Sequence, residues 1–143
     1  MKHVRIISLV LTIVLAIGML ASCGAGETAD HYASKNTEYV IGMSGPLTGG
    51  AAMYGTAVKN SAEMAVAEIN AAGGLNGVKF KLVSIDDQHK ADLVANNYST
   101  LYEGGMQVSL GTVTTAPGLE WKNLSKDDNV FFLTPSASGD AIP

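Results

Sequence analysis

The chain has 143 residues, enough for about one ordinary domain. From Cys23 onward it contains seven Lys, no Arg and 13 acidic residues, which gives a formal charge of −6. This acidic balance and the scarcity of aromatic residues argue against a nucleic-acid-binding protein and against a polybasic membrane-binding patch.

The first 22 residues predict a secretory signal peptide. Lys2 and Arg5 form a short positive region, and the apolar run over residues 6–21 follows it. Sixteen residues suit the apolar region of a signal peptide, whereas a transmembrane helix needs about 20. A transmembrane helix is therefore the less favoured interpretation.

The residues that follow the apolar run predict a lipid anchor. Residues 20–24 read Leu-Ala-Ser-Cys-Gly, which resembles the bacterial lipobox, where the cysteine becomes a lipidated N-terminus. Cys23 is the only cysteine, so an intramolecular disulfide is excluded. Two or more acyl chains on Cys23 would hold the protein firmly, because a single chain binds a membrane only marginally. We expect a protein anchored on the extracytoplasmic face of the cell membrane.

Beyond Cys23 the sequence divides into a tether and a domain. Residues 23–38 are small and polar without periodicity, which is typical of a flexible tether. From Tyr39 apolar runs that predict strands alternate with segments of helical spacing. The predicted strands are residues 39–44, 80–85, 108–111 and 130–133, and the predicted helices are residues 58–69, 91–103 and 117–126.

This alternation predicts an α/β fold, an open parallel sheet with helices on both faces. The sequence ends at Pro143, just after the fourth strand and without a helix to follow it. We therefore expect residues 39–143 to be the N-terminal lobe of a longer protein. Alone, this lobe would have half a cleft and an uncovered sheet face, so we expect it to bind no ligand tightly.

Ligands of open parallel sheets bind beyond the carboxyl ends of the strands. The corresponding loops are residues 45–54, 86–90, 112–117 and 134–139. The first loop lacks both the Gly-Lys-Ser/Thr ending of a P-loop and the Gly-x-Gly-x-x-Gly spacing of a dinucleotide site. None of the four offers a nucleophile–base pair or a metal-ligand cluster. We expect neither an enzyme nor a bound metal or cofactor.

Several polar or aromatic residues have an ordinary structural interpretation. Asp86 and Asp87 could be metal ligands or an acid pair, but carboxylates at a strand end, one of them capping the next helix, are the favoured interpretation. His31 and His89 have no partner at ligand spacing and are expected in solvent. Trp121 lies within a predicted helix and is expected to pack in the core.

Hydroxyl residues gather at two strand ends. They are Thr112, Thr114 and Thr115 before one helix, and Ser136 and Ser138 after the next strand. Helix capping is the ordinary role of each alone. Two such clusters with free N–H groups can instead form an anion site. Because no arginine follows Cys23, a carboxylate held here would depend on such groups.

Five segments resemble the periplasmic binding proteins for branched-chain amino acids, the substrate receptors of ABC importers. They are YVIG, SGPLTG, AEINAAGGLNG, the Asp86–Asp87 pair and VFFLTPSAS, and they span residues 39–138. The resemblance implies two α/β lobes that close over an amino acid, of which this chain contains the first.

The resemblance also implies ligand contacts, position by position. Thr115 matches a hydroxyl residue that binds the α-carboxylate, and Ser136 a residue that offers its backbone. Ser138 matches a hydroxyl residue that touches both carboxylate and ammonium, and Tyr54 an aromatic residue near the ligand side chain. The predicted ligand-binding set is Thr115, Ser136, Ser138 and Tyr54, with the neighbouring Thr114 and Ala137.

The function implied is that of a monomeric, lipid-anchored receptor that delivers an amino acid to ABC permease subunits. Two alternatives use the same fold. One is a sensor that reports its ligand to a signalling partner, and the other is a receptor for amides, urea or other small solutes. An α/β enzyme is a third, which the lack of a catalytic pair disfavours.

Overall fold

The computed structural model describes residues 38–142. The predicted signal peptide, Cys23 and residues 24–37 of the predicted tether lie outside these residues. Within the described part, no helix combines the length and the apolar character that a membrane crossing requires.

The described residues form a four-stranded parallel sheet with the predicted alternation of strands and helices. Its strand order is β2-β1-β3-β4. In chain order the elements are β1 (Glu38–Gly45), α3 (Ala52–Ala71), β2 (Lys79–Asp86), the 3-10 turn η1 (Ala91–Leu93), α4 (Val94–Glu103), β3 (Val108–Ser109), α5 (Thr115–Asp127) and β4 (Phe131–Phe132).

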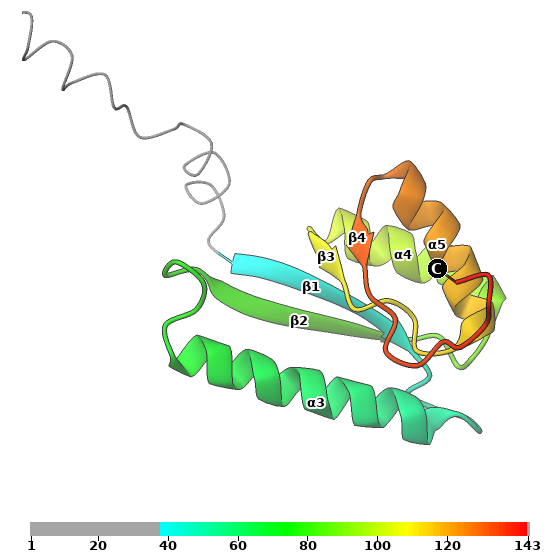
Figure 1. Ribbon diagram of the computed structural model, residues 1–143, viewed down its shortest axis with the longest axis horizontal. Helices are drawn as coiled ribbons and strands as arrows, with labels where there is room; N and C mark the ends of the chain where they lie inside the picture. The colour runs from blue at the N-terminus through cyan, green and yellow to red at the C-terminus, as the bar shows by residue number, and fades with distance from the viewer. Residues whose placement is uncertain (1–37, 143) are drawn as a thin grey trace, which may run out of the picture. The chain divides into compact units, whose positions relative to one another are not determined.

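Helices lie on both faces of the sheet, which confirms the predicted fold class. Helix α3 packs against β1 and β2 on one face, while α4 and α5 pack against each other and against the other face (Figure 1). The buried core lies on the α4/α5 side and contains Val94, Tyr98, Leu101, Met106 and Trp121. Trp121 is fully buried and meets the ring of Tyr98 edge-on at 5.0 Å, so its predicted packing role is confirmed.

The first helix begins six residues earlier than its apolar periodicity predicts, at Ala52 rather than Val58. The first turn of this helix carries Gly55 against the preceding loop, where a Cβ would lie only 2.0 Å from the carbonyl oxygen of Pro46. Absence of a side chain at this position lets the helix start directly beneath the loop. Tyr54 therefore belongs to a helix and not to a loop.

The α3 side of the sheet is only partly covered within the described residues. Val108, Phe131 and Leu133 are 43%, 68% and 57% exposed. Together with apolar residues of α3 and β1 they line a groove of about 310 Å³. The predicted uncovered sheet face is thus found beside β3 and β4, which α3 borders but does not cover.

Candidate functional site

The carboxyl ends of the four strands meet at one edge of the sheet, because all the strands are parallel. Residues 46–51, 87–90, 110–114 and 133–142 follow these ends, and Figure 1 shows them gathered at the same end of the sheet. We call these segments loops 1 to 4. All the predicted ligand-binding residues lie in them or in the first turn of the helix that follows.

Asp86 joins loop 1 to loop 2. Its Oδ1 accepts hydrogen bonds from the backbone N–H groups of Leu47 at 2.8 Å and Gln88 at 2.9 Å, and Oδ2 accepts one from the hydroxyl of Thr48. Partial burial acts to raise the pKa of Asp86, but the bonds from Thr48, Gln88 and Leu47 outweigh it and hold the pKa below its usual value. Asp86 is therefore a carboxylate that fixes loop 1.

Asp87 joins loop 2 to the core. It is fully buried, and it accepts hydrogen bonds from the Ser44 hydroxyl at 3.2 Å and the His89 N–H at 2.9 Å. Burial raises the pKa of Asp87 above its usual value. The prediction that one of the two aspartates caps the next helix is wrong. The 3-10 turn η1 begins at Ala91, and no side chain caps it at its N-cap residue Lys90, because both carboxylates bind N–H groups of the turn before it.

His89 joins loop 2 to the start of α5. The residue is exposed, as predicted, but its Nδ1 lies 2.9 Å from Oγ1 of Thr114. Both Gln88 and His89 have left-handed backbones, with φ of 52° and 63°. The sequence carries no signal for this contact, because the partner lies 25 residues away and nothing in the spacing brings the two together.

Loop 4 lies against loop 3 and the first turn of α5. The hydroxyls of Thr134 and Ser136 donate to the carbonyl oxygens of Thr112 and Val113, each at 2.7 Å. Further along loop 4, the backbone of Gly139 lies so close to Thr115 that a Cβ there would be 2.4 Å from its Cγ2. The two hydroxyl clusters seen in the sequence are therefore parts of one surface.

The N-terminus of α5 is not closed by a side chain. Thr114 occupies the N-cap position with extended backbone, φ −119° and ψ 157°, yet its hydroxyl makes no capping bond. Pro117 has no N–H to offer, and the first bond of the helix runs from Gly118 N to the Thr114 carbonyl at 3.0 Å. The N–H groups of Thr115 and Ala116 are thus left without a side-chain cap, an arrangement that suits a carboxylate or another small anion.

The predicted residues are not all brought together. Thr114, Thr115, Ser136 and Ala137 lie on the joined loop 3, loop 4 and α5 surface, and Ser138 lies between Ala137 and the Gly139 that touches Thr115. The hydroxyl of Ser136 is occupied by Val113, which leaves its backbone as the group it can offer. Tyr54 is 55% exposed on α3, and within residues 38–142 no hydrogen bond or ring contact joins it to the others.

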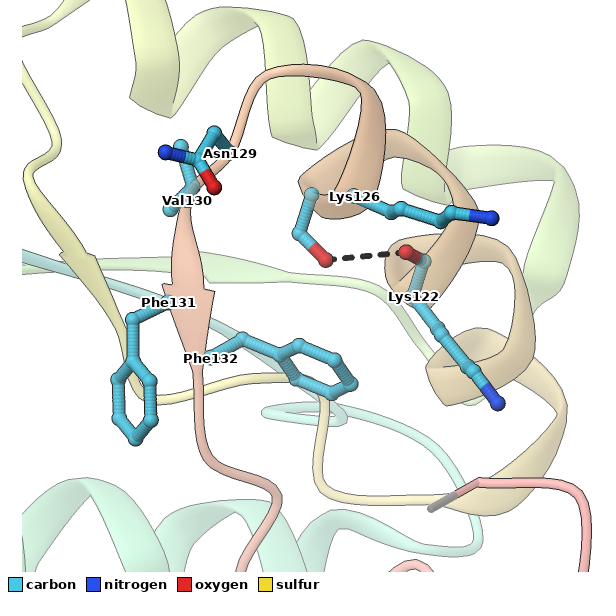
Figure 2. Close-up of a pocket in the computed structure, with 7 residues that line it drawn as sticks. Lys122, Lys126, Asn129, Val130, Phe131 and Phe132 are labelled. Atoms are coloured by element: carbon cyan, nitrogen blue, oxygen red, sulfur yellow. Dashed lines mark hydrogen bonds between the residues drawn. The ribbon is translucent and has the colours of Figure 1, made fainter.

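Another pocket lies away from these loops. It has a volume of about 460 Å³ between the end of α5 and β4, and Figure 2 shows its lining residues. The ammonium groups of Lys122 and Lys126 extend away from the rings of Phe131 and Phe132, and the Ser125 hydroxyl donates to the Lys122 carbonyl at 3.1 Å. This pocket contains none of the predicted ligand-binding residues. Among residues 38–142, no group of three or more His, Cys, Asp or Glu side chains could hold a metal ion.

The sequence is similar to known amino-acid-binding proteins. The chain is 31% identical over 121 residues to a Leu/Ile/Val-binding protein homolog of Brucella melitensis, an alignment that covers 85% of this chain and 33% of that protein. It is 33% identical over 105 residues to the leucine-, isoleucine-, valine-, threonine- and alanine-binding protein of Pseudomonas aeruginosa, covering 71% and 27%. The chain thus spans about a third of the length of these relatives.

A solved structure has the same fold. It is the branched-chain amino acid transporter substrate binding protein LivJ of Streptococcus pneumoniae in complex with isoleucine, with a TM-score of 0.70, 28% identity, and coverage of 73% of this chain and 30% of that one. The periplasmic binding protein family matches residues 38–142, which is most of the sequence. The chain belongs to the periplasmic binding protein family.

Proposed function

We propose that this chain is the N-terminal lobe of an extracytoplasmic receptor that binds a branched-chain amino acid for an ABC importer. The observation that carries the proposal is the uncapped N-terminus of α5, joined to loop 4 at the carboxyl edge of the sheet. Membership of the family and the amino-acid-binding relatives support it.

The open helix end supplies the chemistry for one end of an amino acid. The N–H groups of Thr115 and Ala116 and the Thr115 hydroxyl would bind the α-carboxylate, aided by the positive end of the helix dipole. The exposed hydroxyl of Ser138 and the backbone of Ser136 would provide further contacts to the α-carboxylate. No arginine is needed, which fits a chain that has none after Cys23.

The rest of the ligand would be enclosed by a second lobe. A charged residue of the second lobe would bind the ammonium group of the ligand. Tyr54, on the first lobe, would approach the aliphatic side chain of the ligand. Closure is a hinge motion that the ligand favours because it contacts both lobes only in the closed state. The closed receptor would deliver the amino acid to the permease subunits, without a cofactor and without chemistry on the ligand.

The position of the receptor in the cell follows from its leader. Residues 1–22 would be removed as a signal peptide, Cys23 would carry the lipid, and residues 24–38 would connect it to the lobe. A monomer tethered in this way stays beside its permease on the extracytoplasmic face of the membrane.

The ligand class rests on the relatives of about 30% identity. A solute binding protein of an ABC transporter from Rhodopseudomonas palustris, in complex with 3,4-dihydroxy benzoic acid, has a TM-score of 0.69 but only 20% identity, so it informs the fold alone. An aliphatic amino acid is therefore favoured over other solutes.

Calorimetry on the full-length protein tests the proposal. Leucine, isoleucine and valine should each bind with micromolar or tighter affinity, whereas acetamide, urea and 3,4-dihydroxy benzoic acid should not compete. Binding of an amide or of urea, with no response to the three amino acids, would overturn it. Uptake of labelled leucine by cells that lack only this protein separates transport, in which uptake falls, from sensing, in which it does not.

A further inference from the structure

The contact between His89 and Thr114 depends on an uncommon backbone. Gln88 and His89 are two consecutive non-glycine residues, and both adopt the left-handed backbone conformation, which L side chains disfavour. The carboxylates of Asp86 and Asp87 hold their N–H groups, and Lys90 N donates to the Asp87 carbonyl at 2.8 Å. The turn is thus fixed from both sides, and it places the His89 ring against the start of α5.

Thr114 would otherwise be free to close the helix end. Threonine is a favoured N-cap residue, because its hydroxyl oxygen can accept a bond from an N–H group in the first turn. The backbone of Thr114 already has the extended geometry of an N-cap residue. With Pro117 in the third position, the N–H of Ala116 is the remaining target for such a bond. In the structure Oγ1 of Thr114 faces Nδ1 of His89 instead.

We propose that His89 is a positioning residue of the ligand site, which keeps the Thr114 hydroxyl away from the N–H of Ala116. The helix end then stays open for the carboxylate of the ligand. Without His89, Thr114 caps its own helix, and the ligand must displace that cap in order to bind. This inference rests on the proposed function, since it concerns access to the same carboxylate site.

Two substitutions at position 89 separate this role from a structural one. His89→Gly removes the ring. Glycine adopts the left-handed backbone more readily than any other residue, so this substitution does not strain the turn further. His89→Asn also tolerates this backbone, and its amide group lies the same number of bonds from Cα as Nδ1 of histidine. Glycine should lose the contact with Thr114, and asparagine should keep it.

The first measurement is hydrogen exchange of the Ala116 amide in the ligand-free, full-length protein. Exchange should slow about fivefold in His89→Gly, as expected for a new N-cap bond, and return to the wild-type rate in His89→Asn. Unchanged exchange in His89→Gly, or equal slowing in both variants, would overturn the proposal. This result is independent of which ligand the protein binds.

The second measurement is calorimetry with isoleucine. His89→Gly should weaken binding about fivefold, His89→Asn should restore it, and His89→Gly should have little further effect when Thr114 is already replaced by valine, which has no hydroxyl. An equal loss with threonine and valine at position 114 would show that His89 acts without Thr114, and would overturn the proposal. If the wild type binds none of leucine, isoleucine and valine, the proposed function fails, and the Ala116 exchange alone decides the role of His89.

Discussion

The two faces of the sheet differ in how completely the described residues bury them. On the α4/α5 side, Trp121, Val94 and Leu101 are at most 2% exposed. On the α3 side, Gly55 is the one buried residue of a 20-residue helix, and Phe131 and Leu133 face outward from the sheet. The first face holds the buried core, whereas the second leaves large apolar side chains exposed. Stability should therefore depend mainly on the first face.

The largest effect expected is loss of the α4/α5 core. Trp121→Ala removes a fully buried ring and its edge-on contact with Tyr98, so it should lower the free energy of unfolding by about 3–5 kcal/mol. Phe131→Ala is the matched control, because it also removes an aromatic ring, but from the α3 side, where the Phe131 side chain is 68% exposed. In residues 38–143 it should cost less than about 0.5 kcal/mol, as exposed positions usually do. Denaturant unfolding measures both, and similar losses for the two variants would contradict the comparison.

The next largest effect concerns ligand binding, because the predicted ligand-binding residues are also divided between the α4/α5 side and the α3 side of the sheet. Thr115 begins α5, whereas Tyr54 lies on α3. Thr115→Ala in the full-length protein should weaken amino acid binding by about 1.5–3 kcal/mol, the range for a hydrogen bond to a charged group. Ser138→Ala should act in the same direction, and Tyr54→Ala should cost less than Thr115→Ala. Calorimetry measures these losses.

A helical threonine far from the loops provides the control for Thr115. Thr100 is exposed on α4, and its hydroxyl donates to the Asn96 carbonyl of the same helix at 2.8 Å. Thr100→Ala should leave affinity unchanged. If Thr115→Ala and Ser138→Ala bind as tightly as Thr100→Ala does, the assignment of the carboxylate site is wrong.

A smaller effect should appear as association of the lobe. Residues 38–143 alone expose the apolar groove beside β3 and β4, so they should associate at concentrations where the full-length protein remains monomeric. Replacing Phe131 and Leu133 by serine should reduce the association. Sedimentation velocity measures it, and a monomeric wild-type lobe that binds isoleucine tightly would contradict both this prediction and the expected half-cleft.

The smallest effects are on the dependence of stability on pH, and they have opposite signs for neighbouring aspartates. The pKa of Asp86 is lowered on folding, so its contribution is present above the unfolded pKa of about 3.9 and is lost as the pH falls through the lower folded value. The pKa of Asp87 is raised, so its contribution is present below about pH 3.9 and is lost as the pH rises through the higher folded value.

Amide substitutions separate the two contributions. Asp86→Asn should reduce the loss of stability on acidification, because its favourable carboxylate is gone. Asp87→Asn should increase the gain in stability between pH 3 and pH 7 relative to the wild type, because the cost of ionising a buried carboxyl is removed. Thermal unfolding across this range measures both, and a shift of the same sign in the two variants would show that the buried and the loop-binding carboxylates do not differ as described.

The sequence predicts the regular parts of this molecule well, because they depend on local patterns. The apolar runs and helical spacing lead to the parallel α/β fold, and Trp121 is correctly placed in the core. The start of α3 is missed because its reason is a contact between Gly55 and Pro46 and not an apolar period.

The candidate site is predictable only in part, for a similar reason. Parallel strand ends place Thr115 and the loop of Ser136 and Ser138 at one edge, which the order of elements alone implies. The roles of Asp86 and His89 depend on partners 25 to 39 residues away, and on a left-handed turn that no local preference indicates. Such contacts appear only once the loops are placed in space.

The close approach of Gly139 to Thr115 has a consequence for mutational experiments. Any side chain at position 139 would push loop 4 away from the first turn of α5, since even a Cβ would lie 2.4 Å from Thr115 Cγ2. A saturation scan that reads amino acid binding would therefore score Gly139 as severely as a ligand contact, although glycine has no side chain to offer a ligand. At this position, intolerance to substitution would report the fit between two segments of the chain and not a chemical group.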